Sequence, residues 1–385
     1  MAGCSLHPTL FAPLIMNNTN NPGLLAEWAP QCATMLVWPH SDTDWSPWLV
    51  EITATYIELT RIITRHQPVL LICKNLSHEN SIRARLKTDE QDAQSCPYPV
   101  IFLSAAYNDT WCRDFGPITI QNQQTVALLD FRFNGWGDKY TSDLDDQLCA
   151  TMDQLQIFSA PLTSVDFHLE GGSIDCNGEG LVLTTEACLL SDSRNAKLTK
   201  SDIEQKLLTL FNCKKILWLS HGELIGDDTD SHVDNLARFV NTNTIVYAST
   251  DISDDIHHAP LCAMEKQLHQ LNAENNLGLQ LIPIPIPDPL YDESSGNRLP
   301  ASYINFILIN NAVIVPTFGV PQDELAITTF ASLFPTREIH TINANPLIKQ
   351  FGGPHCASMQ FPVGTLDIAA LSSQQMAAKI RRIQP

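Results

Sequence analysis

The chain has 385 residues, of which 44% are hydrophobic and 17% are charged, as is usual for a globular protein. Its formal net charge is −19 at pH 7. A nucleic-acid partner is not expected, because proteins that bind DNA or RNA neutralise its phosphates with an excess of Lys and Arg. The negative charge favours solubility, and it would also suit an acidic pocket that attracts a small cation.

Eleven cysteines are spread along the chain from Cys4 to Cys356. They form no CxxC pair and no dense cluster with histidines, which argues against a disulfide scaffold and against a structural zinc site. The first residues lack the basic start and long apolar run of a signal peptide, and no apolar run approaches membrane-spanning length. We therefore expect a cytoplasmic protein with free thiols.

Short apolar runs alternate with amphipathic stretches along the whole chain. Ile52, Tyr56, Leu59 and Ile63 recur at helical spacing, which predicts a helix between Trp48 and His66. The pattern of Asp143–Leu155 is also helical. Strands are predicted at Cys32–Trp38, Val69–Cys73, Val100–Leu103, Leu181–Thr185, Ile216–Leu219, Val233–Val240 and Thr244–Ala248.

Two hairpins are predicted, and they exclude a purely parallel sheet. Their strands are Pro117–Ile120 with Val126–Phe131, and Ile304–Ile309 with Ala312–Pro316. Interleaved strands and helices indicate an α/β or α+β protein with mixed sheets. The length suits two small domains or one large one. Pro283–Pro289 could be a linker or an edge strand with a loop, and the recurring strand–strand–helix pattern is compatible with diverged repeats.

The segment Asn108–Pro117, NDTWCRDFGP, has the residue types that recognise a guanidinium group. Asp109 and Asp114 flank Trp111. A carboxylate can accept two parallel N–H bonds from a planar guanidinium, and an aromatic face can stack on it. The simpler interpretation is a turn in which an Asp caps backbone N–H groups.

Two further motifs carry acidic and imidazole groups. Glu170 precedes two glycines at a strand end in LEGGS, where a bulge with a solvated Glu is the alternative. In Gly226–Asn235, GDDTDSHVDN, an extended backbone would place His232 and Asp234 on the same side of a strand. The acidic residues of this segment do not have the EF-hand spacing, so calcium is not expected.

Cys356 lies in the segment FGGPHCASMQFP, directly after His355. A cysteine in an apolar run is more often a small buried hydrophobe than a catalyst. A cysteine protease would need a Cys, a His and one Asn or Asp, whereas this set holds three carboxylates. The surplus favours a cationic substrate whose guanidinium carbon is attacked by the thiolate, with the His moving protons. We expect His355 itself to be a packing or loop residue.

Seven segments together resemble the agmatine deiminase / bacterial peptidylarginine deiminase family, within the guanidino-group modifying superfamily. The resemblance covers about residues 25–362 and implies that residues 1–385 form a single catalytic domain. The implied fold is α/β, a five-bladed, pseudo-fivefold α/β-propeller with a central active site. The segments are Ala26–His40, Asn108–Pro117, Phe133–Tyr140, Leu169–Asn195, Gly226–Asn235, Leu299–Gly319 and Gly352–Cys356.

The resemblance also implies roles for individual residues. Cys356 would be the nucleophile and His232 the general acid/base, while Glu170 would hydrogen-bond the histidine or the guanidinium. Asp114 and Asp234 would grip the guanidinium. The expected substrate contacts also include Trp111, Trp136 and Arg238. The implied reaction hydrolyses agmatine to N-carbamoylputrescine and ammonia through an S-amidino intermediate, in polyamine biosynthesis, without a metal or organic cofactor. The partner is thus a small guanidino cation, and a homo-oligomer is a reasonable expectation.

Two departures from the family pattern concern substrate choice. FGGPHC replaces the form GGGNIHC, and HVDNLARF replaces HVDNFACF, so that Arg238 follows the His–Asp pair. Free or peptidyl arginine remains an alternative substrate, since Arg132, Arg238 and Arg298 lie near the motifs. Amidinotransfer to an amine and a non-catalytic binding protein are further alternatives. The intact set of Cys, His and carboxylates argues against the last of these.

Overall fold

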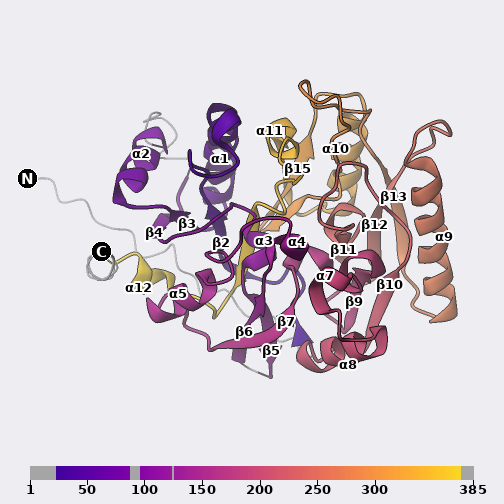
Figure 1. Ribbon diagram of the computed structural model, residues 1–385, viewed down its shortest axis with the longest axis horizontal. Helices are drawn as coiled ribbons and strands as arrows, with labels where there is room; N and C mark the ends of the chain where they lie inside the picture. Colours follow the sequence, from indigo (N-terminus) through magenta and orange to yellow (C-terminus); the bar gives the residue numbers. More distant parts are fainter. Residues whose placement is uncertain (1–22, 87–95, 124, 374–385) are drawn as a thin grey trace, which may run out of the picture.

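Five small sheets follow one another around a common centre (Figure 1). The computed structural model describes residues 23–86, 96–123 and 125–373. The prediction that the first residues are not a signal peptide lies outside the described residues. Within these ranges, no helix is long and apolar enough to cross a membrane.

The sheets share one pattern, in which a central strand has an antiparallel partner on one side and a parallel partner on the other. In chain order the central strands are β2 (Gln31–Val37), β6 (Thr125–Arg132), β9 (Leu181–Thr185), β12 (Thr244–Ser249) and β15 (Ala312–Thr317). Their antiparallel partners are β17 (Ser358–Pro362), β5 (Ile118–Asn122), β8 (Ile174–Cys176), β11 (Ala237–Asn241) and β14 (Ile307–Ile309).

The parallel partners complete the five sheets. They are β3 (Val69–Cys73), β7 (Leu162–His168), β10 (Lys215–Leu219), β13 (Gln280–Pro285) and β16 (Glu338–Asn343). Two sheets gain a fourth strand, β4 (Val100–Ser104) beside β3 and β1 (Gly23–Leu24) beside β5. The repeated pattern confirms the predicted five-bladed α/β-propeller, and β17 pairs with β2 to close the ring.

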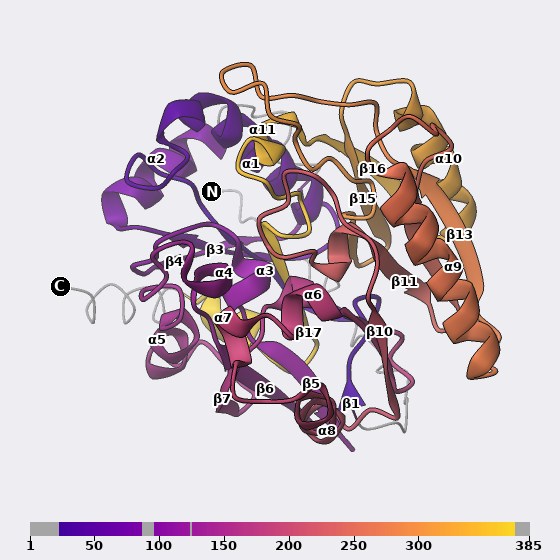
Figure 2. The same ribbon diagram turned by 45° about the vertical axis from the view of Figure 1, so that its right-hand side comes forward.

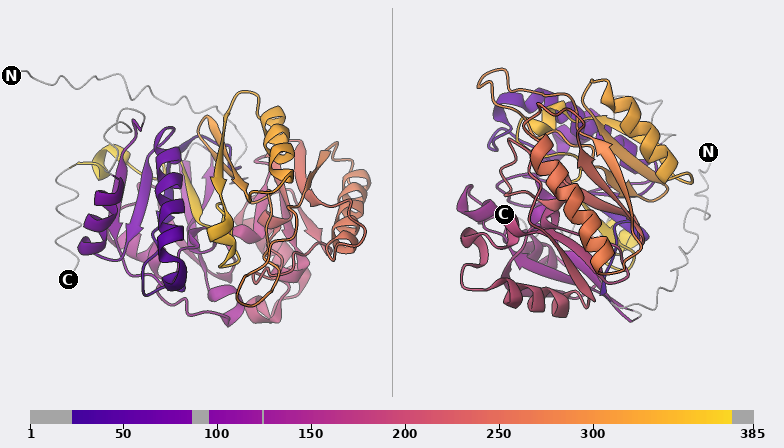
Figure 3. Two further views of the ribbon diagram at one scale, coloured as in Figure 1. Left: turned by 90° about the horizontal axis from the view of Figure 1, so that it is seen from above. Right: turned by 90° about the vertical axis from the view of Figure 1, so that its right-hand side faces the viewer.

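The long helices lie at the outer edge of the sheets (Figure 3). They are α1 (Leu49–Thr64), α2 (Leu76–Leu86), α8 (Lys200–Leu210), α9 (His258–Glu274) and α10 (Gln322–Leu333). Short helices connect the strands: α3 (Cys112–Phe115), α4 (Gly135–Asp138), α5 (Leu148–Gln154), α6 (Glu186–Leu189), α7 (Asp192–Asn195), α11 (Asn345–Ile348) and α12 (Ile368–Leu371). In α1 the predicted face of Ile52, Tyr56, Leu59 and Ile63 is fully buried, as an amphipathic helix against a sheet requires.

Most predicted elements are confirmed, including both hairpins. Three predicted elements are shorter than expected: Val233–Asn235 is a turn of 3-10 helix before β11, α5 covers only the second half of Asp143–Leu155, and β14 begins at Ile307. Of the two alternatives for Pro283–Pro289, the edge strand is correct. The first residues of this segment belong to β13, which pairs with β12 on one side only. Proline has no backbone N–H to donate, and on the unpaired edge of β13 no neighbouring strand requires one.

A buried ion-pair network joins four parts of the ring through Arg238 on β11. Its guanidinium bonds the carboxylates of Asp175 on β8 (3.1 Å) and Glu27, just before β2. It also donates to the carbonyls of Ile304 and Phe306 and lies 4.1 Å over the Phe306 ring. The expected contact of Arg238 with substrate is therefore not seen, because every guanidinium nitrogen already faces a protein acceptor.

Replacing Arg238 should destabilise the fold strongly. In Arg238→Met, two carboxylates lose their buried cation, which typically costs about 3–5 kcal/mol. The matched control is Arg132→Met, which breaks the 2.9 Å pair of a half-exposed arginine with Asp146 and should cost less than about 1 kcal/mol. Urea denaturation followed by tryptophan fluorescence measures both, and equal losses would contradict the structural role of Arg238.

Candidate active site

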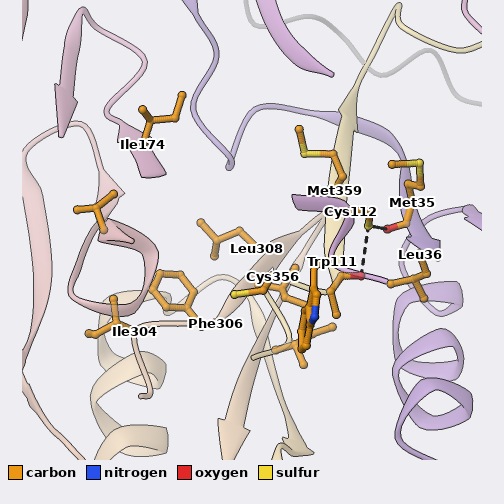
Figure 4. Packing of buried hydrophobic residues seen from close by; sticks show 14 of the residues in the cluster. Met35, Leu36, Trp111, Cys112, Ile174, Ile304, Phe306, Leu308, Cys356 and Met359 are labelled. Carbon is orange, nitrogen blue, oxygen red and sulfur yellow. Dashed lines mark hydrogen bonds between the residues drawn. The ribbon is translucent and has the colours of Figure 1, made fainter. Parts of the chain in front are cut away.

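The thiol of Cys356 lies at the centre of the ring, on the turn that precedes β17. Its Sγ is 3.1 Å from the Asn305 amide nitrogen and 3.5 Å from Asp234 Oδ2. The backbone of the turn is fixed on both sides, since Cys356 N donates to Asn305 Oδ1 and Cys356 O accepts from Arg113 N. Figure 4 shows Cys356 and Trp111 within the buried hydrophobic cluster, where the nearby Cys112 donates to the Met35 carbonyl.

The glycine-rich approach to Cys356 is needed for close packing. A Cβ on Gly352 would lie 2.4 Å from the ring of Trp111, so a side chain there would displace the tryptophan. The residue before Gly352, Phe351, has a positive φ of 66°. The loop thus presses its backbone against Trp111 and holds the thiol beside that ring.

His232 and Asp114 face each other across a small gap. His232 Nδ1 is 3.6 Å from Asp114 Oδ1. Asp114 accepts hydrogen bonds from Gly172 N at 2.8 Å and from the Trp136 indole at 2.9 Å. A Cβ on Gly172 would come within 2.8 Å of both His232 and Asp114. The LEGGS glycine therefore preserves the space between an imidazole and a carboxylate.

His232 and Asp234 reach the site by a different route from the one predicted. The backbone is extended only at His232, and Val233–Asn235 then form a 3-10 turn. Side chains therefore do not alternate as in a strand. The turn nevertheless directs Asp234 to the thiol of Cys356 and His232 to Asp114. The two side chains therefore meet in one site as expected, but a turn and not a strand brings them there.

Trp136 is presented by a strained turn. Gly135, Trp136 and Gly137 all have left-handed φ values, of 64°, 57° and 89°. Non-glycine residues rarely adopt this conformation. The Asn134 side chain supports the turn by accepting from Gly137 N at 3.0 Å. This backbone conformation points the indole N–H of Trp136 towards Asp114.

Glu170 is held by a residue that the sequence analysis did not single out. The Arg194 guanidinium donates to both Glu170 oxygens, at 2.7 and 3.0 Å, and also binds Asp230 at 2.6 Å. Ligand atoms of Glu170, Cys188 and His232 lie within 4.8 Å of one another and could together hold a metal ion. The buried Arg194 charge already neutralises Glu170, which disfavours a cation there.

His355 is more than the packing residue expected from the sequence. Its Nδ1 lies 2.8 Å from Asp234 Oδ2, and its Nε2 lies 2.8 Å from Glu27 Oε2. Asn305, also missed, donates to Asp234 as well as to the Cys356 thiol. Glu27 and Asn305 do fall within the segments that carry the family resemblance, but neither residue type indicates its partners without the fold.

The pKa values of the buried ionisable groups shift in opposite directions. Burial would raise the pKa of Asp234, but the hydrogen bond and charge of His355 outweigh it and lower that pKa. Burial raises the pKa of Asp114, although His232 opposes the shift. Burial would lower the pKa of His232, yet the carboxylate of Asp114 and the nearby Cys188 raise it well above the usual value. The raised pKa favours the protonated form of His232, which can act as a proton donor.

Burial and the charges of Asp234 and Asp114 raise the pKa of Cys356 well above its ordinary value. The free protein thus holds a neutral thiol. Among the described residues, Asp234 Oδ1 and both ring nitrogens of His232 are buried without a hydrogen-bond partner. Unpaired buried polar atoms are costly. A cationic ligand could donate a hydrogen bond to Asp234 Oδ1, and its positive charge beside the thiol would lower the thiol pKa.

A pocket of about 360 Å³ leads to Cys356 from the surface. Trp111, Trp136 and Asp114, which are three of the residues expected to contact the substrate, line it. Its remaining lining holds two carboxylates, two aromatic rings and three uncharged residues: Asp109, Asp228, Tyr140, Phe351, Thr229, Gln350 and Gly352. The structure therefore brings Cys356, His232, Asp114 and Asp234 together beneath an acidic mouth, with Glu170 beside them.

The profile of the Porphyromonas-type peptidyl-arginine deiminases matches residues 23–362. The chain belongs to this family. The match spans all five sheets and includes every residue of the site described above, so the expected family is confirmed.

Individual relatives, compared by sequence and by structure, support the same family. The agmatine deiminase of Pseudomonas aeruginosa is 31% identical, over 88% of this chain and 94% of the relative. A cysteine-to-serine variant of the C. jejuni agmatine deiminase with substrate bound is 37% identical, with a TM-score of 0.80 over 88% of this chain and 96% of that one. The agmatine deiminase of Enterococcus faecalis is 25% identical, with a TM-score of 0.79 over 90% and 97%. A hydrolase acting on guanidino C–N bonds follows from these relatives.

The raised thiol pKa can be tested in the free protein. Alkylation of Cys356 by iodoacetamide should be slow at neutral pH and should accelerate towards alkaline pH, because only the thiolate reacts. Asp234→Asn removes the nearest negative charge and should move this profile to lower pH. Asp228→Asn, at the pocket mouth, is the control and should leave the profile unchanged. Peptide mass spectrometry separates Cys356 from the other cysteines, and identical profiles for Asp234→Asn and the unaltered protein would refute the electrostatic cause.

Proposed function

We propose that this protein is an agmatine deiminase, which hydrolyses agmatine to N-carbamoylputrescine and ammonia. The observation that carries this proposal is the acidic pocket over Cys356, which has carboxylates both at the thiol and at its mouth. The inner carboxylates suit a guanidinium and the outer ones suit an amine. Agmatine has these two cations at its two ends.

Asp114 and Asp234 are placed to bind the guanidinium from two sides. Asp234 has one oxygen near the thiol and the other without a partner. A guanidinium accepted between these carboxylates would have its central carbon beside Cys356 Sγ. The bound cation would stabilise the thiolate, so the nucleophile would form mainly when substrate is present.

In the first step, Cys356 Sγ forms a bond to the guanidinium carbon. The C–N bond to a terminal nitrogen then breaks, and that nitrogen leaves as ammonia with a proton from His232. The product is an S-amidino intermediate on Cys356, still positively charged and still between the two carboxylates. The raised pKa of His232 suits it to the role of proton donor.

In the second step, His232, now neutral, takes a proton from water. The water oxygen bonds to the amidino carbon, the C–S bond breaks, and its electron pair returns to Cys356 as a thiolate. The remaining hydroxyl proton is lost as the carbonyl forms and converts the departed ammonia to ammonium in solution. The ureido product leaves with its carbonyl oxygen derived from water. Each turnover therefore consumes one water molecule and restores both residues. We propose Glu170 as a group that stabilises the positive charge of His232 rather than one that contacts the reacting atoms.

The pocket mouth favours agmatine over arginine. Asp109 and Asp228 line it, and Tyr140 donates to Asp228 at 2.8 Å. Within the described part of the chain, no Lys or Arg side chain lines this pocket. Two of the arginines considered for a substrate carboxylate are already paired elsewhere, Arg132 with Asp146 and Arg298 with Asp255. An α-carboxylate would meet negative charge at this mouth, whereas an amine would meet its counter-ions.

Several wider properties follow from this proposal. We infer that the chain acts as a single catalytic domain, since its site draws on all parts of the ring. We also infer a cytoplasmic enzyme of polyamine biosynthesis, which uses a small guanidino cation and no nucleic acid or membrane partner. A homo-oligomer is proposed on general grounds for a metabolic enzyme.

A comparison of three substrates tests the function. Agmatine, arginine and a blocked arginyl peptide are incubated with the protein, and the ureido product is measured. Agmatine should be strongly preferred. Cys356→Ala should lose roughly 10⁴-fold or more in activity, while the exposed Cys262→Ala should lose none. Preference for arginine or the peptide would identify another deiminase, and full activity in Cys356→Ala would refute the mechanism.

The contact with the amine can be tested separately. Asp228→Asn should raise KM for agmatine by about tenfold with little change in kcat, because it removes binding that is equal in the ground and transition states. Butylguanidine, which lacks the amine, is the matched control and should be unaffected. An equal change for both substrates would show that Asp228 does not bind the tail.

The same carboxylates predict a pH dependence. Burial raises the pKa of Asp109 to about 7 and that of Asp228 to about 6. Both groups are ionised above these values, so kcat/KM for agmatine should fall as the pH drops through this range. The fall should be smaller for butylguanidine. Parallel profiles for the two substrates would contradict this assignment.

A further inference from the structure

We propose that His66, Glu338 and His340 form a binding site for a divalent transition-metal ion, best suited to zinc. None of the three residues lines the catalytic pocket. The residues come from opposite ends of the sequence, so their spacing resembles no metal-binding motif. The fold alone brings them together.

The two imidazoles face each other with their Nε2 atoms 2.8 Å apart. The Glu338 carboxylate is 3.8 Å from His66 Nε2 and 3.4 Å from His340 Nε2. One ligand atom from each residue thus lies within 4.8 Å of the other two. Imidazole nitrogen and carboxylate oxygen are the ligands that zinc uses outside cysteine-rich sites.

A small adjustment would accommodate the ion. With Zn–N bonds of about 2.0–2.1 Å and a tetrahedral angle, the two nitrogens would be roughly 3.3–3.4 Å apart. The rings must therefore separate by about half an ångström. Glu338 is 62% exposed and each histidine side chain is 10% exposed, so the carboxylate can rotate inward and water can supply the fourth ligand.

The backbone explains why the three side chains converge. Glu338 and His340 are alternate residues of β16, so they lie on the same face of that strand. His66 follows the end of α1, which packs against β16. Figure 2 shows both elements in the upper half of the view, where the beginning and the end of the ring meet.

The charges around the site also suit a cation. The Glu338 carboxylate lies beside both imidazoles and offers the site a negative charge. Arg65, the neighbour of His66 in the chain, carries a positive charge that partly opposes a cation. A bound ion would link α1 of the first sheet to β16 of the fifth.

Zinc binding to tag-free, chelator-treated protein tests this proposal. Calorimetry should show a single ion bound per chain, and the melting temperature should rise with zinc because the ion binds the native state. His66→Gln and His340→Gln should each weaken binding by at least about tenfold. The exposed His269→Gln on α9 should bind as the unaltered protein does, and all variants should retain deiminase activity.

Cobalt(II) distinguishes this site from the cysteines. Bound through two imidazoles and a carboxylate, cobalt should show tetrahedral d–d bands without a sulfur-to-cobalt charge-transfer band. The proposal is overturned by a strong charge-transfer band, by equal affinity in His66→Gln, or by a failure to bind zinc.

Discussion

The buried chain of hydrogen bonds and ion pairs that runs from Asp234 through His355 and Glu27 to Arg238 supports the rest of the site. Each link is a direct contact between groups removed from water. Because an unpaired charge is costly there, each group fixes the next. Burial would raise the pKa of Glu27, but Arg238 and His355 lower it, so this carboxylate stays ionised. The chain holds Asp234 as an anion beside Cys356, where a cationic substrate needs it.

The ring architecture explains how distant residues meet. Asp114 precedes the second sheet and Glu170 the third, while Asp234 precedes the fourth and Cys356 precedes the strand that closes the first. Asp114 lies on the short helix α3, and the other three lie on turns or 3-10 segments. Four modules of the ring thus supply groups to a shared centre, and the fourth supplies both His232 and Asp234. The departure from symmetry is chemical, since the groups are a thiol, an imidazole and carboxylates.

The sequence predicted much of this arrangement, and the failures have physical reasons. Apolar periodicity located β3 and α1, because burial on one face or on both imposes a clear pattern. It failed at Val233–Asn235, since three buried residues of a 3-10 turn look the same as a strand. The roles of His355 and Asn305 could not be predicted, because they depend on partners far away along the chain. Arg238 was placed near the substrate by proximity in sequence, whereas its buried partners decide its position.

The nucleophile sits immediately before β17, the strand that pairs with β2 and completes the circle. The contact joins the two ends of the described fold, and it forms only after nearly the whole chain has emerged from the ribosome. A nascent chain that ends before Cys356 therefore carries the carboxylates and the histidine of the site but not the nucleophile. The same segment closes the ring and supplies the nucleophile. A chain that ends before this segment would therefore have neither a closed ring nor a reactive thiol at its centre.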